Sequence, residues 1–191
     1  MIDAWAESAE SWDDNPAVRQ YAAAAHHSLL GVLARERFSL EGRDVLDFGC
    51  GTGLLTARLV EDAGSIIGLD TSAAMLERFE SRARSWSHVR AEAGPLAAGV
   101  RVDLVVASSV LGFVPDLAAT VRVLASHLRS GGMLVHWDWE QQPEGEDGVS
   151  HEGVRAAVAS AGLELRSLDV GFELQGDGYT MAPLMGVARK R

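Results

Sequence analysis

The most constraining feature of this chain is a run of alternating glycines between a strand-like and a helix-like segment. The strand-like segment, Val45–Phe48, is short and mostly apolar, which is typical of a buried strand. Three glycines follow at alternate positions, and residues 54–59 then resume a helical pattern. A strand, a glycine-rich turn and a helix in succession predict the nucleotide-holding corner of an open α/β sheet, where backbone without Cβ atoms approaches a ligand closely.

The spacing of the glycines separates two kinds of cofactor loop. A dinucleotide-binding loop reads G-x-G-x-x-G, which from Gly49 requires a glycine at the position that Leu54 occupies. The pattern here is an acid, Asp47, followed by G-x-G-x-G. It resembles motif I of the class I S-adenosylmethionine-dependent methyltransferases of the small bacterial type. The resemblance implies S-adenosylmethionine as cofactor, with Gly51 and Gly53 in a loop against its methionine end; a purely structural turn is the alternative.

A second acid stands where a ribose would be held. Asp70 closes the apolar run 65–70, the next expected parallel strand, 21 residues after Gly49. An acid about 20 residues beyond the first glycine suits a carboxylate that accepts both hydroxyl protons of a ribose. Asp70 could instead cap the following helix, but Thr71 or Ser72 fits that role better and leaves Asp70 for the ligand.

The remaining segments alternate between helical and strand-like patterns. Asn15 and Pro16 are typical of a helix start. The expected helices cover residues 16–38, 54–62, 72–86, 115–128 and 150–161, and the expected strands cover 45–48, 65–70, 89–93, 102–108, 133–138, 163–174 and 179–188. Residues 175–178 form a turn too short for a parallel return, so the last two strands are expected to be antiparallel.

Five parallel strands followed by an antiparallel hairpin is the arrangement of the class I methyltransferases. The resemblance covers the chain from about Asp44 to the C-terminus. It implies a single-domain α/β fold with a Rossmann-like, doubly wound sheet of seven strands in the order 3-2-1-4-5-7-6, strand 7 being antiparallel. Residues 1–40 are expected to form an N-terminal helical cap over the pocket, and residues 41–191 the methyltransferase core.

Ligands of such sheets bind beyond the carboxyl ends of the strands, which selects the expected cofactor residues. The resemblance puts Glu92 near the adenine amino group, although the family more often has aspartate there. Trp12 lies in a segment similar to the family's aromatic segment over the cofactor; alternatively, Trp5 and Trp12 only fix this segment to the core. The expected cofactor set is Trp12, Asp47, Gly49, Cys50, Gly51, Gly53, Asp70, Thr71, Met75, Glu92, Ala93 and Ser108.

The acceptor side of the site is less well marked. Many relatives carry a histidine near position 112 or 113, where this chain has Gly112 and Phe113, so that candidate base is missing. His136 and Asp138 share one face of the fifth strand if it alternates, and they are expected to wall the acceptor pocket. His151 begins the next helix and is expected to reach the acceptor. The acids and histidines lack the spacing of metal ligands, so no metal is expected.

Composition narrows the partners. The 191 residues carry a formal net charge of −10, which disfavours a nucleic-acid substrate and favours a small-molecule acceptor. The single cysteine, Cys50, fits a reducing cytoplasm and is expected to be a small residue in the turn, not a catalytic thiol. The first residues lack the features of a signal peptide, and no run is long and apolar enough to span a membrane. The oligomeric state cannot be deduced from the sequence.

Two functions compete with methyl transfer to a small molecule. A protein that binds the cofactor without turnover, as a regulator or partner subunit, is allowed by the lack of a clear base. The intact pattern of Asp47, three glycines and Asp70 argues against it. An NAD-dependent oxidoreductase is excluded by Leu54.

Overall fold

The computed structural model describes residue 3 and residues 5–141, 147–176 and 179–191. The chain divides into two compact units, unit 1 (Met1–Ala97) and unit 2 (Ala98–Arg191), and each is described by itself. Within the described residues, no helix is both long enough and apolar enough to cross a membrane.

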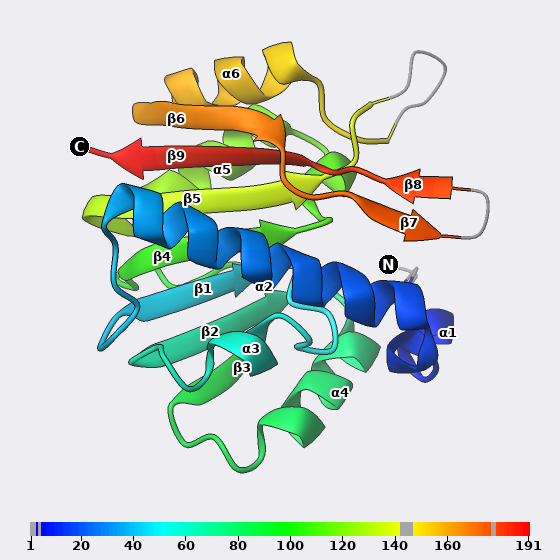
Figure 1. Cartoon of the computed structure of the whole chain (residues 1–191). Helices are drawn as coiled ribbons and strands as arrows, with labels where there is room; N and C mark the ends of the chain where they lie inside the picture. The colour runs from blue at the N-terminus through cyan, green and yellow to red at the C-terminus, as the bar shows by residue number, and fades with distance from the viewer. Residues whose placement is uncertain (1–2, 4, 142–146, 177–178) are drawn as a thin grey trace. The chain divides into compact units, whose positions relative to one another are not determined.

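Unit 1 contains three parallel strands in the order β3-β2-β1 (Figure 1). The strands are β1 (Asp44–Phe48), β2 (Ser65–Asp70) and β3 (Val89–Ala93). The central residues of β1 and β2 are fully buried, as expected for apolar runs in a parallel sheet covered on both faces. Because the three strands run in the same direction, Phe48, Asp70 and Ala93 end at one edge of this sheet.

The helices of unit 1 include two long ones and two short ones. Helix α2 (Pro16–Glu36) starts where Asn15 accepts a hydrogen bond from the N–H of Ala17, and it buries a stripe of Tyr21, Ala22, Ala25, Leu29, Val32 and Leu33. Helix α4 (Ala73–Ala83) is capped by Ser72 and packs against β2 and β3. Helix α3 (Thr56–Leu59) follows the glycines. The short helix α1 (Ala6–Ala9) and the 3-10 turn η1 (Trp12–Asp14) precede α2, and α1 contacts α4.

The larger group of paired strands in unit 2 has the order β4-β5-β9-β6, the other part of the predicted order, with β9 in the place of strand 7. The strands are β4 (Val102–Ser108), β5 (Leu128–Asp138), β6 (Leu163–Val170) and β9 (Leu184–Lys190). Strands β4 and β5 are parallel, and β9 is antiparallel to both β5 and β6, as predicted. The N-terminal part of β9 and most of β4 are buried, so this sheet forms the centre of the core of unit 2.

Unit 2 also contains two helices and a short turn. Helix α5 (Leu117–His127) contacts β5, and α6 (His151–Ser160) contacts β6 and α5 (Figure 1). Both begin at side-chain caps: Asp116 accepts from the N–H of Ala119, and Ser150 accepts from the N–H of Gly153. The 3-10 turn η2 (Leu111–Phe113) lies between β4 and α5.

The structure differs from the expected elements at several places. Helix α3 is shorter than residues 54–62, although Leu55 and Val60 at its ends keep helical angles. Residues 130–132, which precede the expected strand 133–138, lie inside β5, because the pairing with β4 shifts register between Val102 and Leu104 and accommodates the extra residues. The expected last strand is divided around Pro183, which has no N–H to donate to a ladder.

That division produces a second small sheet. Strands β7 (Leu174–Gly176) and β8 (Tyr179–Met181) pair antiparallel and extend beyond β6 and β9 (Figure 1). The expected strand 163–174 therefore ends at Val170, where the N–H of Gly171 donates to the carbonyl of Pro183. Of the expected turn 175–178, residues 177 and 178 lie outside the described residues.

Candidate functional site

The glycine loop is fixed to the end of β2 by backbone hydrogen bonds. The N–H groups of Gly49 and Cys50 both donate to the carbonyl of Leu69, at 2.8 and 3.1 Å. Gly51 and Gly53 have φ angles of +53° and +84°, a left-handed region that other residues rarely adopt. The alternating glycines are therefore required by the backbone path of this loop.

Asp70 connects the end of β2 to the loop. One carboxylate oxygen, Oδ2, accepts from the N–H of Gly51 at 2.8 Å, and the other, Oδ1, accepts from the N–H of Ser72 at 2.9 Å. A carboxylate oxygen can accept two hydrogen bonds, so each oxygen retains capacity for a further donor. Ser72 caps helix α4 through its own hydroxyl, which confirms that the cap is not Asp70.

The backbone at Gly51 borders open space. A Cβ atom built there would meet no heavy atom within 4 Å, whereas one at Gly53 would lie 2.8 Å from the Phe79 ring. At Gly51 the missing side chain leaves room beside a loop that Asp70 holds in place. An acceptor and an uncovered stretch of backbone are therefore next to each other, and the role of Asp70 in holding ribose hydroxyls stays a prediction.

Asp47 lies behind the loop, in the interior of unit 1. Its side chain is 1% exposed, and its Oδ2 accepts from the Thr56 hydroxyl at 2.6 Å. Burial, together with the negative charge of Asp70, raises the pKa of Asp47 to about 6 against the bonds from Thr56. Its part in holding the cofactor stays a prediction.

Cys50 points into the apolar interior. It packs in a cluster with Leu76 and Phe79. Burial and the nearby acids Asp47 and Asp70 raise the pKa of the Cys50 thiol well above its usual range, which keeps it protonated and unreactive. This placement fits the expectation of a small structural residue.

The other expected cofactor residues of unit 1 lie at the same edge of the sheet. Ala93 is the strand partner of Asp70, and Glu92 is held by Arg90 at 2.8 Å. Thr71 is exposed at the end of β2, whereas Met75 is buried in the first turn of α4. These four residues surround Asp70 in sequence and pairing, and their contacts with a cofactor stay predictions.

The N-terminal segment is attached to both loops of this corner. The rings of Trp5 and Trp12 meet edge to face with centroids 5.8 Å apart, a contact that favours the stapling role. Asp3 accepts from the Ser72 hydroxyl at 2.8 Å, which lowers the pKa of Asp3. Thr52, in the glycine loop, donates to Asp13 of η1 at 2.6 Å.

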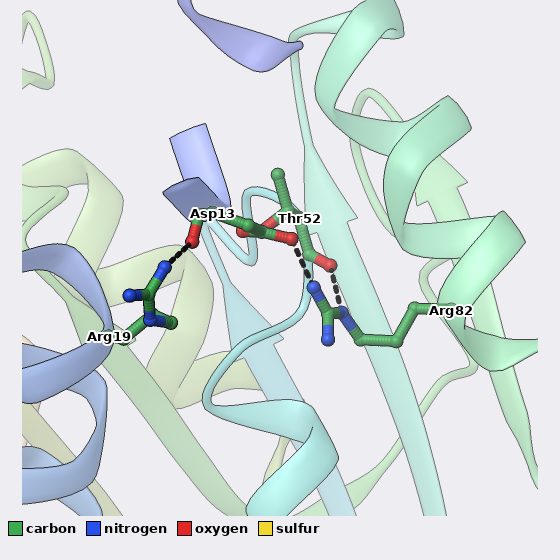
Figure 2. A network of polar contacts seen from close by, with 4 residues as sticks. All are labelled: Asp13, Arg19, Thr52 and Arg82. Carbon is green, nitrogen blue, oxygen red and sulfur yellow. Dashed lines mark hydrogen bonds and ion pairs between the residues drawn. The ribbon is translucent and has the colours of Figure 1, made fainter. Parts of the chain in front are cut away.

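Asp13 belongs to a polar network that sequence reasoning missed. Its carboxylate also pairs with Arg82 of α4, and its carbonyl accepts from Arg19 of α2 (Figure 2). Arg82 in turn donates from Nε to the carbonyl of Thr52 at 2.9 Å. Asp13 and Arg82 are 69 residues apart in the sequence, so no local sequence pattern predicts their contact.

In unit 2, the expected cofactor residue Ser108 is the last residue of β4. Ser108 is half-buried and pairs with Trp137 of β5. The next residue, Ser109, has φ +57°, and its N–H donates to the carbonyl of Trp137 at 2.6 Å. A serine held in the left-handed region at the end of a parallel strand marks a strained position, which is where binding residues often occur.

His136 and Asp138 form a buried pair at the end of β5. The Nδ1 of His136 lies 3.0 Å from Oδ2 of Asp138, which confirms that the two share a face of the strand. The other oxygen of Asp138 accepts from the N–H of Gly112 at 3.1 Å. The Nε2 edge of His136 covers Gly186 of β9, and no described residue gives this nitrogen a hydrogen-bond partner. Their role as acceptor residues stays a prediction.

His151 differs from this pair because its side chain is half exposed. Its Nε2 lies 3.6 Å from Oε1 of Glu140, whose side chain is also exposed. Across the described ranges, no group of three or more histidine, cysteine, aspartate or glutamate side chains could hold a metal ion.

The fold and the loop define the general class first: a Rossmann-like α/β protein with a glycine-rich loop and an acid at the end of its second strand. A family model described as a methyltransferase domain matches residues 46–134. A methyltransferase structure from Clostridium acetobutylicum superposes with a TM-score of 0.70 at 15% identity, over 88% of this chain and 91% of that one. NodS, an N-methyltransferase from Bradyrhizobium japonicum solved with S-adenosylhomocysteine, gives 0.71 at 20% identity, over 100% and 93%.

The family model and the solved structures support the resemblance to the class I S-adenosylmethionine-dependent methyltransferases, and the predicted fold class is confirmed. The predicted cofactor, S-adenosylmethionine, is the one this family uses. Among curated proteins, a trans-aconitate 2-methyltransferase from Azoarcus is 32% identical over 76% of this chain and 56% of its own length. One from Enterobacter is 32% identical over 81% and 61%. The chain thus spans little more than half the length of these two relatives.

Proposed function

We propose that this protein transfers the methyl group of S-adenosylmethionine to a small-molecule acceptor. The observation that carries the proposal is the Asp70 carboxylate, which holds Gly51 beside open space while keeping acceptor capacity for ribose hydroxyls. The family match and the solved structures support the choice of cofactor.

The bound cofactor supplies an activated methyl group and its own leaving group. The protein therefore has to orient the cofactor and the acceptor in line, which is worth about 7–11 kcal/mol in favourable cases. In this proposal Asp70 accepts hydrogen bonds from the ribose hydroxyls, and Glu92 and Ala93 lie near the adenine. The glycine loop lies against the methionine end of the cofactor. The exposed surface of Thr71 lies next to Asp70 at the same corner.

A base is needed only when the acceptor atom carries a proton in its resting state, and it adds about 10²–10⁴-fold. Of the two expected acceptor histidines, His136 is buried against Gly186, whereas His151 is half exposed near Glu140. His151 is therefore the better candidate to exchange a proton with an acceptor.

The small-molecule acceptor is supported by charge and by the curated relatives. Two arginines of the segment 82–90 are paired with acids, Arg82 with Asp13 and Arg90 with Glu92. These pairs and the net charge of −10 disfavour a polyanionic nucleic acid. A cytoplasmic location is part of the proposal, since the only cysteine is a buried, unpaired thiol.

Trans-aconitate itself is not carried over from the relatives. It is a tricarboxylate, and binding it calls for cationic side chains. The residues after the two parallel strands of unit 2, 109–116 and 139–151, include no lysine or arginine but do include Asp116, Glu140 and Asp147. This composition favours an acceptor with few negative charges.

Release of S-adenosylhomocysteine tests the proposal against a binding protein without turnover. The chain is incubated with S-adenosylmethionine and a panel of amines, phenols and carboxylic acids. Turnover with one acceptor class supports methyl transfer, and cofactor binding without turnover on any class would leave the regulator or partner role.

A further inference from the structure

One acid outside the expected cofactor set bears directly on the shape of the glycine loop. Asp13 lies in η1, and its carboxylate receives the Thr52 hydroxyl and the Arg82 guanidinium (Figure 2). Arg82 also donates to the carbonyl of Thr52 at 2.9 Å. Asp13, Thr52 and Arg82 therefore close a ring of polar contacts in which each residue touches the other two.

Thr52 is the residue through which this ring acts on the loop. Its side chain is buried, and it stands between Gly51 and Gly53, which have left-handed angles. Glycine is the residue with the least conformational preference, so a loop built on alternate glycines does not fix its own path. The hydroxyl and the carbonyl of Thr52 supply the constraint from one side, and the bond from Gly51 to Asp70 supplies it from the other.

The attachment of Asp13 is itself well supported. Its carbonyl accepts from Arg19 of α2, so η1 is held to the helix that follows it. The side chains of Arg82 and Asp13 are 29% and 36% exposed, so solvent screens their ion pair in part. Asp3 repeats the arrangement at the neighbouring loop by accepting from Ser72, which donates its N–H to Asp70.

We infer that Asp13 is a positioning residue for the cofactor. It holds Thr52 so that the backbone of Gly51–Gly53 keeps the shape that receives the methionine part, while Asp70 holds the ribose part from the end of β2. The inference rests on the proposed function. It assigns the N-terminal segment a role in cofactor affinity that depends on the carboxylate of Asp13 and not on the ring of Trp12.

Titration calorimetry with two ligands tests this role. S-adenosylhomocysteine carries the amino-acid chain that corresponds to the methionine part of the cofactor, and 5′-methylthioadenosine lacks this chain. Asp13→Ala is expected to weaken binding of S-adenosylhomocysteine at least tenfold and binding of methylthioadenosine less than threefold. Asp13→Asn keeps an oxygen for Thr52 but loses the ion pair, so its effect should be intermediate. Asp14→Ala removes an exposed acid from the same turn and serves as the matched control, with unchanged affinity.

A double-mutant test links the effect to the ring of contacts. In a Thr52→Val, Arg82→Met background, Asp13→Ala should have less than a twofold further effect on affinity, because its partners are already gone. Urea unfolding of each variant shows that the titrated protein is folded, and Asp13→Asn carries the test if Asp13→Ala does not fold.

The outcomes separate the inference from the proposed function. If the unmodified chain binds neither ligand, the proposed function fails and the inference fails with it. If the unmodified chain binds both and the Asp13 variants bind S-adenosylhomocysteine equally well, only the inference is overturned. An equal loss of both ligands in a folded variant would also overturn it, because that result indicates a general effect on the fold.

Discussion

The Asp70 carboxylate accepts a hydrogen bond from the backbone N–H of Gly51, with the two heavy atoms 2.8 Å apart. This contact joins the ends of two neighbouring strands, since Gly51 follows β1 and Asp70 closes β2. One residue thus orders the loop and offers the oxygen atoms that a ribose requires.

Asp70→Ala should weaken binding of S-adenosylhomocysteine by about tenfold or more, since charge-assisted hydrogen bonds contribute about 1.5–3 kcal/mol. Calorimetric titration measures the change. Glu61→Ala, at an exposed position of the same unit, is the control and should leave affinity unchanged. Unchanged affinity in Asp70→Ala would refute the ribose assignment.

Asp47 should make the stability of the protein depend on pH. Its pKa is about 6 in the folded protein against an ordinary value of 3.8, so its contribution is fully present below about pH 3.8 and is lost as pH rises through 6. The loss is about 3 kcal/mol, from about 1.4 kcal/mol for each pKa unit. Asp47→Asn cannot ionise and therefore avoids this loss of stability. Urea unfolding should show that the variant is more stable than wild type at pH 8.

That gain should shrink as the pH is lowered toward 4.5, where Asp47 of the wild type is protonated. Glu61→Gln, which removes an exposed acid, should show no such trend. A constant difference between Asp47→Asn and wild type at all pH values would show that the Asp47 carboxyl does not titrate near pH 6.

The thiol of Cys50 should be protected from alkylation. Burial raises its pKa and covers its sulfur, so iodoacetamide at pH 8 should react about two orders of magnitude more slowly with the native chain than with the chain in urea. Mass spectrometry over time gives both rates. Similar rates in the two states would mean that Cys50 is accessible at the loop.

Removing the Asp138 carboxylate should destabilise unit 2. Asp138→Ala leaves the Gly112 N–H and the His136 ring without their acceptor, and each buried unsatisfied group costs about 1–3 kcal/mol. Urea unfolding should therefore show a loss of about 2 kcal/mol or more, against little change for Asp169→Ala at an exposed position of β6. Equal stabilities of the two variants would contradict a structural role for the pair.

Much of the fold could be predicted because buried parallel strands appear in the sequence as short apolar runs, bounded by glycines and by helix-capping residues. The strands β1, β2, β3 and β4 lie within one residue of their expected ranges. The C-terminal region was harder, because Pro183 divides what alternation indicates as one strand. Register shifts, such as the one between β4 and β5, depend on pairing partners and leave no local signal.

The site could be predicted only as far as local motifs extend. The glycine spacing and the position of Asp70 gave the cofactor corner, and alternation gave the shared face of His136 and Asp138. Alternation cannot tell which face a later strand covers, so the burial of His136 against Gly186 was not foreseeable. The contact between Asp13 and Arg82 needs two segments 69 residues apart to meet, which only the fold decides.

The central claim is that the corner formed by Asp70 and the glycine loop holds a sulfonium nucleoside. Parallel calorimetric titrations of the unmodified chain with S-adenosylhomocysteine and with NAD test it most directly. The account predicts saturable binding of S-adenosylhomocysteine with one site per chain and no heat of binding for NAD. Binding of NAD alone, or of neither ligand by the folded chain, would contradict it.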